Sequence, residues 1–199
     1  MTDLIAFITA RLDEDEQWAL AASAPYRYAV EGATVPPGGV HWTWVTGDNW
    51  NPIPVDPVGE EYVGESGDGG HVNLASVEEW PGRPWTLEDG SKVPSGMMRA
   101  TVANSMTEVQ SAPAGHIARH DPARVLREVA AKRRTLAALD QRRHFLDNTE
   151  WYGCRAIDGD DRPTGAACSC GRDDEVLKQQ RLLAEVFADH PDYRQEWAP

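Results

Sequence analysis

The fold is decided by residues 121–146, which read DPARVLREVAAKRRTLAALDQRRHFL. Asp121 is a preferred helix N-cap, and proline is favoured at the first helical position, where its missing N–H would be unpaired anyway. Apolar residues then recur at alternating steps of three and four, namely at Val125, Val129, Leu136, Leu139 and Leu146. With its entry segment, this pattern predicts one long helix over 116–147.

The predicted helix is basic, whereas the protein as a whole is acidic. Seven Lys and Arg residues oppose three acidic residues on the helix, but the 199-residue chain has 19 basic and 32 acidic residues, a net charge of −13. The acidic excess is concentrated in residues 1–100, with 16 acidic and 5 basic residues. We therefore expect the helix to pair with the acidic half of its own chain. Nucleic-acid binding through 122–146 is the alternative, which the overall charge disfavours.

The remaining segments predict a single α+β domain over 1–199. Residues 1–24 have helical apolar spacing, whereas 25–115 contain 10 of 14 prolines and 13 of 17 glycines, which favours short strands and turns. The clearest strand is 40–45, in which Val40, Trp42 and Trp44 share one face. We expect an antiparallel sheet of about four strands to pack against the N-terminal helix, the long basic helix and a C-terminal helix within 173–199.

Several protein classes are excluded or disfavoured. No apolar run approaches the ~18 residues that a membrane span requires, and three cysteines cannot form a disulfide scaffold. The acidic opening differs from a secretory signal, so we expect a cytoplasmic location. The charge also favours association with a protein partner, and no membrane partner is expected.

The three cysteines predict a structural zinc site. Cys154, Cys168 and Cys170 lie in the polar connection 148–172, which has no strong secondary-structure pattern. Zinc in structural sites takes four Cys and His ligands, and binding would hold such a connection in place. His144 is the preferred fourth ligand because it is nearer in sequence, with His190 as the alternative. Free thiols, with Cys154 filling an apolar site, are the competing interpretation.

Two other groups of residues are candidates for function. His116 and His120 would share a helix face, which suggests a metal-dependent hydrolase as an alternative function, although the metalloprotease pattern is absent. No nucleophile-elbow motif occurs, so we expect no catalytic residues and favour a non-enzymatic protein. Trp50, Trp80 and Trp85 lie beside Pro and Gly, and they could form a peptide- or ligand-binding surface or cap a small core.

Three segments resemble an uncharacterised family of small proteins from actinobacteria and their phages. They are residues 116–134 (HIARHDPARVLREVAAKRR), the ending 184–197 with its FADHPDYRQEW run, and residues 1–16 with RLDEDE. The family has no assigned function, so the resemblance implies no activity and is compatible with an accessory, phage-encoded protein.

The resemblance also bears on the predicted zinc site. Family members often have a His near the end of the long helix and a Cys-x2-Cys pair after it, with a further Cys before the last helix. It therefore implies a ligand set of His144, Cys154, Cys168 and Cys170. The close pair is Cys-x-Cys here and lies later in the chain, which is a departure from that pattern.

Overall fold

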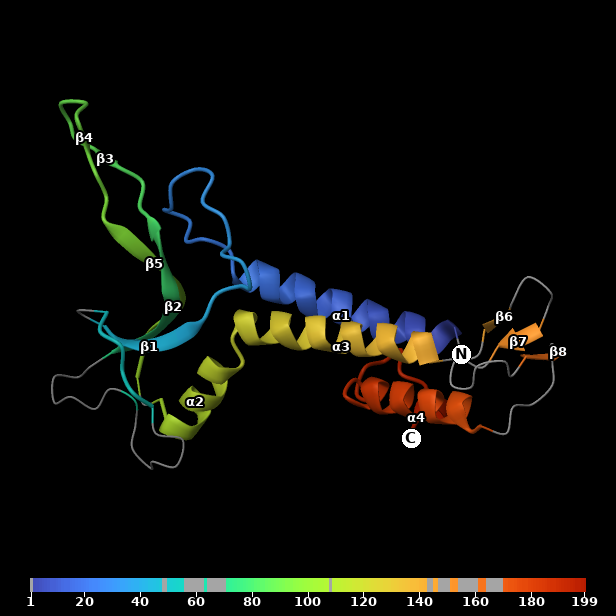
Figure 1. Ribbon diagram of the computed structural model, residues 1–199. Helices are drawn as coiled ribbons and strands as arrows, with labels where there is room; N and C mark the ends of the chain where they lie inside the picture. Colours follow the sequence, from blue (N-terminus) through green and yellow to red (C-terminus); the bar gives the residue numbers. More distant parts are fainter. Residues whose placement is uncertain are drawn as a thin grey trace. The chain divides into compact units, whose positions relative to one another are not determined.

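The computed structural model confirms an α+β protein (Figure 1). It describes residues 2–47, 50–55, 63, 71–107, 109–142, 145–146, 151–153, 161–163 and 170–199, with only the backbone described for Thr2 and for the short strands between 145 and 163. The chain forms two compact units, one of residues 16–127 and one of residues 1–15 with 128–199. Two long helices, α1 (Thr2–Ala22) and α3 (Pro122–Arg142), each contribute to both units.

The unit of residues 16–127 is built on a three-stranded antiparallel sheet. Its strands are β1 (Trp42–Thr46), β2 (Val72–Pro81) and β5 (Met97–Met106), in the order β1-β2-β5. Among the described residues this sheet has three strands, against the expectation of about four. Bulges interrupt the pairing of β2 with β5, so that Ala75 lies opposite Thr101 and Glu79 opposite Arg99.

The strand predicted at 40–45 begins two residues later, at Trp42, and ends one residue later, at Thr46. Trp42 and Trp44 lie on one face as expected, because they pair with Ser76 and Leu74. Val40 precedes the strand, and its carbonyl accepts a hydrogen bond from the Ala123 amide over 3.0 Å. Pairing with the start of α3 therefore replaces the sheet hydrogen bond that the alternating pattern predicted.

The core of this unit lies between the sheet and helix α2 (Ser111–Arg119). Trp44 is 1% exposed, and its indole donates a hydrogen bond to the Ala114 carbonyl over 2.9 Å. A cluster of buried residues surrounds this contact: Val63, Val72, Leu74, Val109 and Ala114. The alternation of apolar residues in β1 thus supplies the side chains that α2 covers.

The helix predicted over 116–147 is divided in two. Helix α2 ends at Arg119, and α3 begins at Pro122 after the cap residue Asp121, whose Oδ1 accepts a 2.7 Å hydrogen bond from the Arg124 amide. A residue before proline is sterically disfavoured in helical conformation, so the N-cap signal also ends the preceding helix. Gly39, with φ of +87°, packs against this helix start, and a Cβ atom there would lie 3.2 Å from the Ala123 Cα.

A β-ribbon extends from the sheet between β2 and β5. It consists of β3 (Trp85–Thr86) and β4 (Lys92–Val93), with Trp85 opposite Val93. The turn closes through a hydrogen bond from the Leu87 amide to the Ser91 carbonyl, and Asp89 accepts hydrogen bonds from the Ser91 amide and hydroxyl. These contacts define the loop between the two strands.

The other unit contains α4 (Arg172–Glu185), the short helix η1 (Gln195–Trp197) and a small sheet. The sheet has the order β6 (Phe145–Leu146), β7 (Trp151–Gly153) and β8 (Asp161–Pro163). The C-terminal aromatic residues pack on α1: the Phe7 ring centroid lies 5.0 Å from that of Trp197 and 6.0 Å from that of Tyr193.

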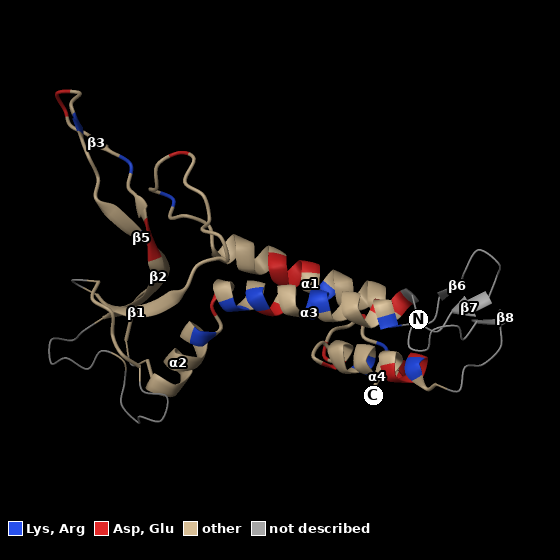
Figure 2. Ribbon diagram, in the orientation of Figure 1, with Lys and Arg blue, Asp and Glu red and all other residues tan. Residues whose placement is uncertain are grey.

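Acidic residues of α1 face basic residues of α3 within this unit (Figure 2). Arg133 forms a 2.6 Å ion pair with Asp13, while the Lys132 ammonium lies 5.3 Å from the Phe187 ring centroid. Burial raises the pKa of the Asp15 carboxyl, although the positive charge of Lys132 acts in the opposite direction. These contacts agree with the expected internal pairing of the basic helix.

Candidate functional site

Most of the predicted zinc ligands lie outside the described residues. This applies to His144, Cys154 and Cys168, whereas Cys170 is exposed just before α4. The alternative ligand His190 has a contact at each ring nitrogen, with the Arg11 guanidinium at Nε2 and the Asp192 amide at Nδ1. Within the described part of the chain, no group of three or more His, Cys, Asp or Glu side chains could hold a metal ion.

His116 and His120 lie together, as their spacing predicted. Their ring centroids are 4.0 Å apart, and the His120 Nδ1 lies 2.9 Å from the His116 carbonyl oxygen, a contact in which the ring N–H donates. Both side chains are exposed at the end of α2. The hydrolase hypothesis requires a third ligand, and the described residues place none beside this pair.

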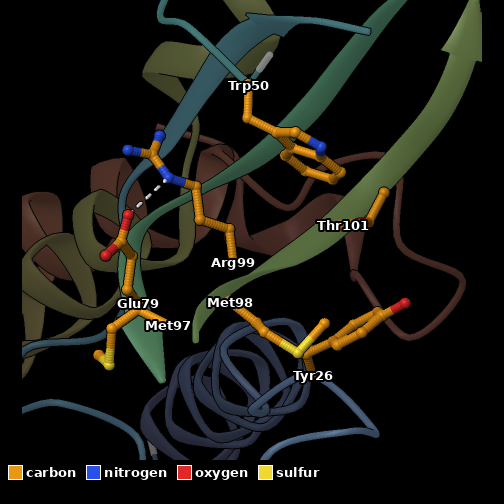
Figure 3. A pocket seen from close by; sticks show the side chains of 7 residues that line it. All are labelled: Tyr26, Trp50, Glu79, Met97, Met98, Arg99 and Thr101. Atoms are coloured by element: carbon orange, nitrogen blue, oxygen red, sulfur yellow. Dashed lines mark hydrogen bonds and ion pairs between the residues drawn. The ribbon is translucent and has the colours of Figure 1, made fainter. Parts of the chain in front are cut away.

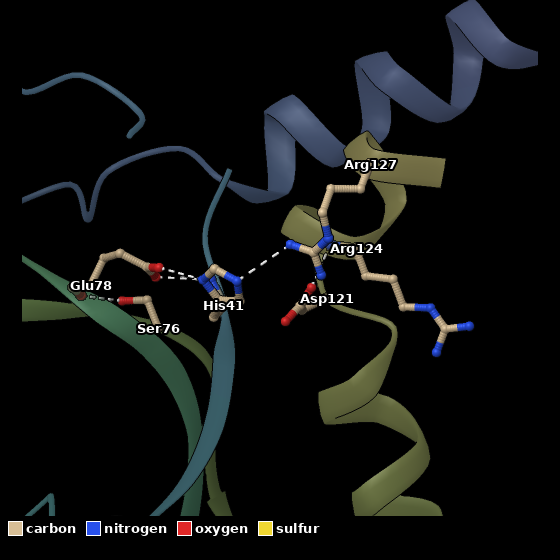
Figure 4. A network of polar contacts seen from close by, with 6 residues as sticks. All are labelled: His41, Ser76, Glu78, Asp121, Arg124 and Arg127. Atoms are coloured by element: carbon tan, nitrogen blue, oxygen red, sulfur yellow. Dashed lines mark hydrogen bonds and ion pairs between the residues drawn. The ribbon is translucent and has the colours of Figure 1, made fainter. Parts of the chain in front are cut away.

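A polar network that the sequence did not predict joins the start of β1, β2 and α3 (Figure 4). Glu78 accepts hydrogen bonds from the His41 amide over 2.9 Å and from its Nδ1 over 2.8 Å, while the His41 Nε2 lies 3.5 Å from Arg127. The nearby Ser76 hydroxyl donates to the Glu78 carbonyl and accepts from the Ala100 amide. The hydroxyl therefore uses both its donor and its acceptor capacity within the sheet. We interpret the network as structural: it connects β1, β2 and α3.

A hollow of about 320 Å³ lies on the face of the sheet that carries Glu79, Arg99 and Thr101 (Figure 3). Aromatic rings from Tyr26 and Trp50 contribute to its wall. The guanidinium Nε of Arg99 lies 3.2 Å from Glu79 Oε1, so the two charges compensate each other. This volume falls at the lower end of the range of small ligand-binding sites.

Two methionines and a strained tryptophan complete the hollow. Met97 and Met98 add flexible, polarizable thioether groups, which adapt to ligands of varied shape. Trp50 has φ of 56°, in the left-handed region, where a bulky residue is a genuine outlier. Backbone strain of this kind is concentrated at functional sites.

Exposed apolar side chains continue from this hollow along the ribbon. We use the name apolar arm for four residues, with exposed fractions of 67% for Trp85, 50% for Leu87, 42% for Val93 and 57% for Met97. Met97 belongs to both the arm and the hollow. Trp80, by contrast, is only 6% exposed and donates to the Thr34 carbonyl over 3.2 Å, so it belongs to the core.

Comparison with known proteins identifies a family and gives no activity. Residues 1–199 match DUF6221, described as a family of unknown function. No curated protein and no solved structure matches the chain significantly. The expected resemblance to an uncharacterised family is thus confirmed, whereas an actinobacterial or phage source stays a prediction. Among the described helices, none has the length and apolar character needed to cross a bilayer.

Proposed function

Because this chain belongs to the DUF6221 family, whose function is unknown, we propose from its own surface that it is a non-enzymatic protein-interaction or accessory protein. It binds a protein partner through the apolar arm. The observation that carries this proposal is the exposure of four large apolar side chains, Trp85, Leu87, Val93 and Met97, within one short segment.

A protein partner is expected to bury the apolar arm when it binds. A contiguous exposed apolar surface marks an interaction site, whereas scattered apolar residues are normal. A two-stranded ribbon is at best marginally stable in water, so contact with a partner would stabilise β3 and β4. Tryptophan is among the residues that contribute most to binding when an interface buries them, which makes Trp85 the expected anchor.

The charge of the chain indicates the kind of partner. With a net charge of −13, the protein would attract a basic partner and repel acidic ones. Such complementarity mainly increases the association rate and the specificity, and added salt weakens it. The partner is therefore proposed to be a basic protein of the cytoplasm, with apolar contacts at the arm and electrostatic attraction at longer range.

Affinity capture with matched tryptophan variants tests this function. Trp85→Ser removes the proposed anchor, and Trp18→Ser removes a tryptophan that is 71% exposed on α1. Mass spectrometry should identify a protein that wild-type and Trp18→Ser baits retain and the Trp85→Ser bait loses. Retention of the same proteins by all three baits would contradict binding through the arm.

A structural zinc ion is also part of the proposal, with His144, Cys154, Cys168 and Cys170 as ligands. Two observations support it. The β6–β8 sheet has strands of only two or three residues, and Phe145, which follows His144 in the chain, pairs with Gly153, which precedes Cys154. So small a sheet can bury little apolar surface, and a bound ion would stabilise it.

Metal analysis of the purified protein tests the zinc proposal. We expect one zinc ion per chain in the wild type and in a Ser169→Ala control, and loss of the ion in Cys168→Ser. Metal-free wild-type protein, prepared without chelators, would show that the cysteines serve another purpose.

A further inference from the structure

We propose that the hollow beside Trp50 takes one bulky apolar side chain of a basic, extended peptide that pairs with the open edge of β5. This inference rests on the proposed interaction function and specifies the partner segment. Trp50, the lining of the hollow, the position of β5 in the sheet and the distribution of charge each contribute to it.

Hydrogen bonds hold the backbone of Trp50 in a strained conformation, which destabilises the fold. The Trp50 amide donates to the Thr46 carbonyl over 3.2 Å, and the Asn51 amide donates to the Thr46 hydroxyl over 3.1 Å. The Thr46 amide in turn donates to the Asn51 carbonyl over 2.9 Å. These three bonds stabilise a turn whose tryptophan has φ of 56° and keeps 37% of its surface exposed at the hollow. A glycine would satisfy the same turn without strain, so the indole itself is the useful feature.

The lining of the hollow suits an uncharged, bulky group. Tyr26 and Trp50 offer ring surfaces, and Met97 and Met98 adapt to the shape of what binds. Glu79 and Arg99 are the charged side chains among the described residues of the lining, and they form an ion pair, so neither is an isolated charge. An aromatic or branched aliphatic side chain therefore fits the hollow better than a charged one.

Of the two edge strands of the sheet, β1 and β5, we expect the peptide to pair with β5. Beyond β1, the Ile53 amide donates to the Trp44 carbonyl over 2.8 Å, so this side is occupied by a neighbouring segment. Beyond β5, the described residues supply no further strand. β5 is ten residues long, and Met97, Arg99 and Thr101 all line the hollow. A strand added there would pair through its backbone and could direct alternate side chains towards the hollow.

The charge of the surface near the hollow favours a basic peptide. Glu31, Glu78 and Glu79 line a second hollow of about 600 Å³, which shares Glu79 with the first. No basic side chain of the described residues lines that second hollow. A basic peptide would therefore be attracted to this part of the surface, in agreement with the overall charge of −13.

The experiment measures fluorescence anisotropy with a labelled peptide, Thr-Lys-Thr-Phe-Thr-Lys-Thr, in which both lysines share the face of the extended chain that carries the phenylalanine. Three relatives are compared: one with Ala in place of Phe, one with Glu in place of both Lys, and one with alternate backbone amides methylated. We expect the Phe peptide to bind at least about tenfold more tightly than the Ala peptide, since burial of a phenylalanine supplies that difference. The Glu and N-methylated peptides should also bind more weakly, because each lacks the charge or the backbone donors for pairing.

Protein variants locate the binding site. Trp50→Gly should weaken binding of the Phe peptide roughly thirtyfold, as expected for an interface tryptophan. Met97→Glu changes a side chain that is 57% exposed, so it provides a second test that folding does not limit. Trp18→Ser should leave the affinity unchanged.

The outcomes separate this inference from the function on which it rests. Equal binding of the Phe and Ala peptides, or of the methylated and unmethylated ones, would overturn the inference, as would full affinity in Trp50→Gly and Met97→Glu. If the peptide tests fail in this way but the Trp85→Ser bait loses the partner, the proposed interaction through the apolar arm is still supported. If capture is unaffected by Trp85→Ser, the proposed function itself fails.

Discussion

The indole N–H of Trp44 and the main-chain carbonyl of Ala114 form a 2.9 Å hydrogen bond that connects β1 to α2 inside the core. Both residues are almost fully buried, at 1% and 0% exposure. A buried polar group without a partner is strongly unfavourable, so each of these two groups depends on the other. The contact therefore defines the depth at which α2 packs on the sheet.

Replacement of Trp44 by phenylalanine should destabilise the unit of residues 16–127. The change leaves the Ala114 carbonyl without its donor and creates a small cavity, for a combined loss of about 2–4 kcal/mol. Chemical denaturation followed by circular dichroism measures the free energy of unfolding. Trp18→Phe, at an exposed position on α1, is the control and should change it little. Equal stability of the two variants would show that the hydrogen bond is dispensable.

Loss of the Asp121 cap should weaken the start of α3. Its Oδ1 accepts the Arg124 amide over 2.7 Å, so Asp121→Ala should reduce the free energy of unfolding by about 0.5–2 kcal/mol. Asp121→Asn keeps an acceptor oxygen and should retain most of the stability. If both variants unfold at the same denaturant concentration as the wild type, the cap contributes nothing measurable.

Local patterns in the sequence were sufficient to predict much of the fold. The alternation around Trp42 and Trp44 predicted their common face, and Asp121 followed by proline predicted the start of α3. The same dipeptide also ends α2, whereas one continuous helix was predicted over 116–147. Helical spacing cannot reveal a break when the residues on both sides are themselves helical.

The candidate site could not be predicted in the same way. Trp80 and Trp85 both lie near Pro and Gly, yet one is buried opposite Met98 and the other is exposed on the ribbon. The hollow brings Trp50 together with residues of β2 and β5, and bulges change which residues lie opposite each other in those strands. Sequence periodicity contains no information about such bulges, so among the residues of the hollow and the apolar arm only Trp50 and Trp85 were candidates from the sequence.

Asp15 should make stability depend on pH. Burial raises the pKa of its carboxyl above the ordinary value of 3.8, so the folded protein binds this proton more tightly than the unfolded chain does. The free energy of unfolding is therefore reduced as the pH rises from about the ordinary value through the raised pKa, and the ionised carboxylate opposes folding at pH 7.

Removal of that charge by Asp15→Asn should stabilise the protein at pH 7. The gain should be less than about 1 kcal/mol, because solvent screens a partly exposed group, and it should vanish below the ordinary pKa. Thermal unfolding across the acidic range measures it. Asp13→Asn, which loses the ion pair with Arg133, should give no such gain. A gain that persists at low pH would have another cause than ionisation.

The strain at Trp50 can be measured by comparing two substitutions at the same position. Trp50→Gly and Trp50→Ala both remove the indole, but only glycine adopts a φ of 56° without steric penalty. We expect the glycine variant to be more stable than the alanine variant by about 1–2 kcal/mol, as measured by denaturant unfolding. Alanine at least as stable as glycine would mean that the turn relaxes when the indole is absent.

The C-terminal residues should detach when their aromatic anchor is removed. Trp197 is 8% exposed and packs against Phe7, and the Arg194 guanidinium lies 5.1 Å from its ring centroid while also pairing with Asp3. Trp197→Ala removes both ring contacts and should destabilise the docked tail by up to about 3–5 kcal/mol. This loss should release residues 194–199 before the rest of the unit unfolds, because Arg194 is then held only by exposed ion pairs of small value, whereas His190 and Tyr193 keep their contacts with Phe7. In limited proteolysis, Trp197→Ala should therefore be cut near Arg194 much faster than the wild type. The control is Glu196→Gln, which changes an exposed residue next to Trp197 and should resist cleavage as the wild type does. Equal cleavage rates in all three proteins would show that packing of the aromatic residues does not hold the tail in place.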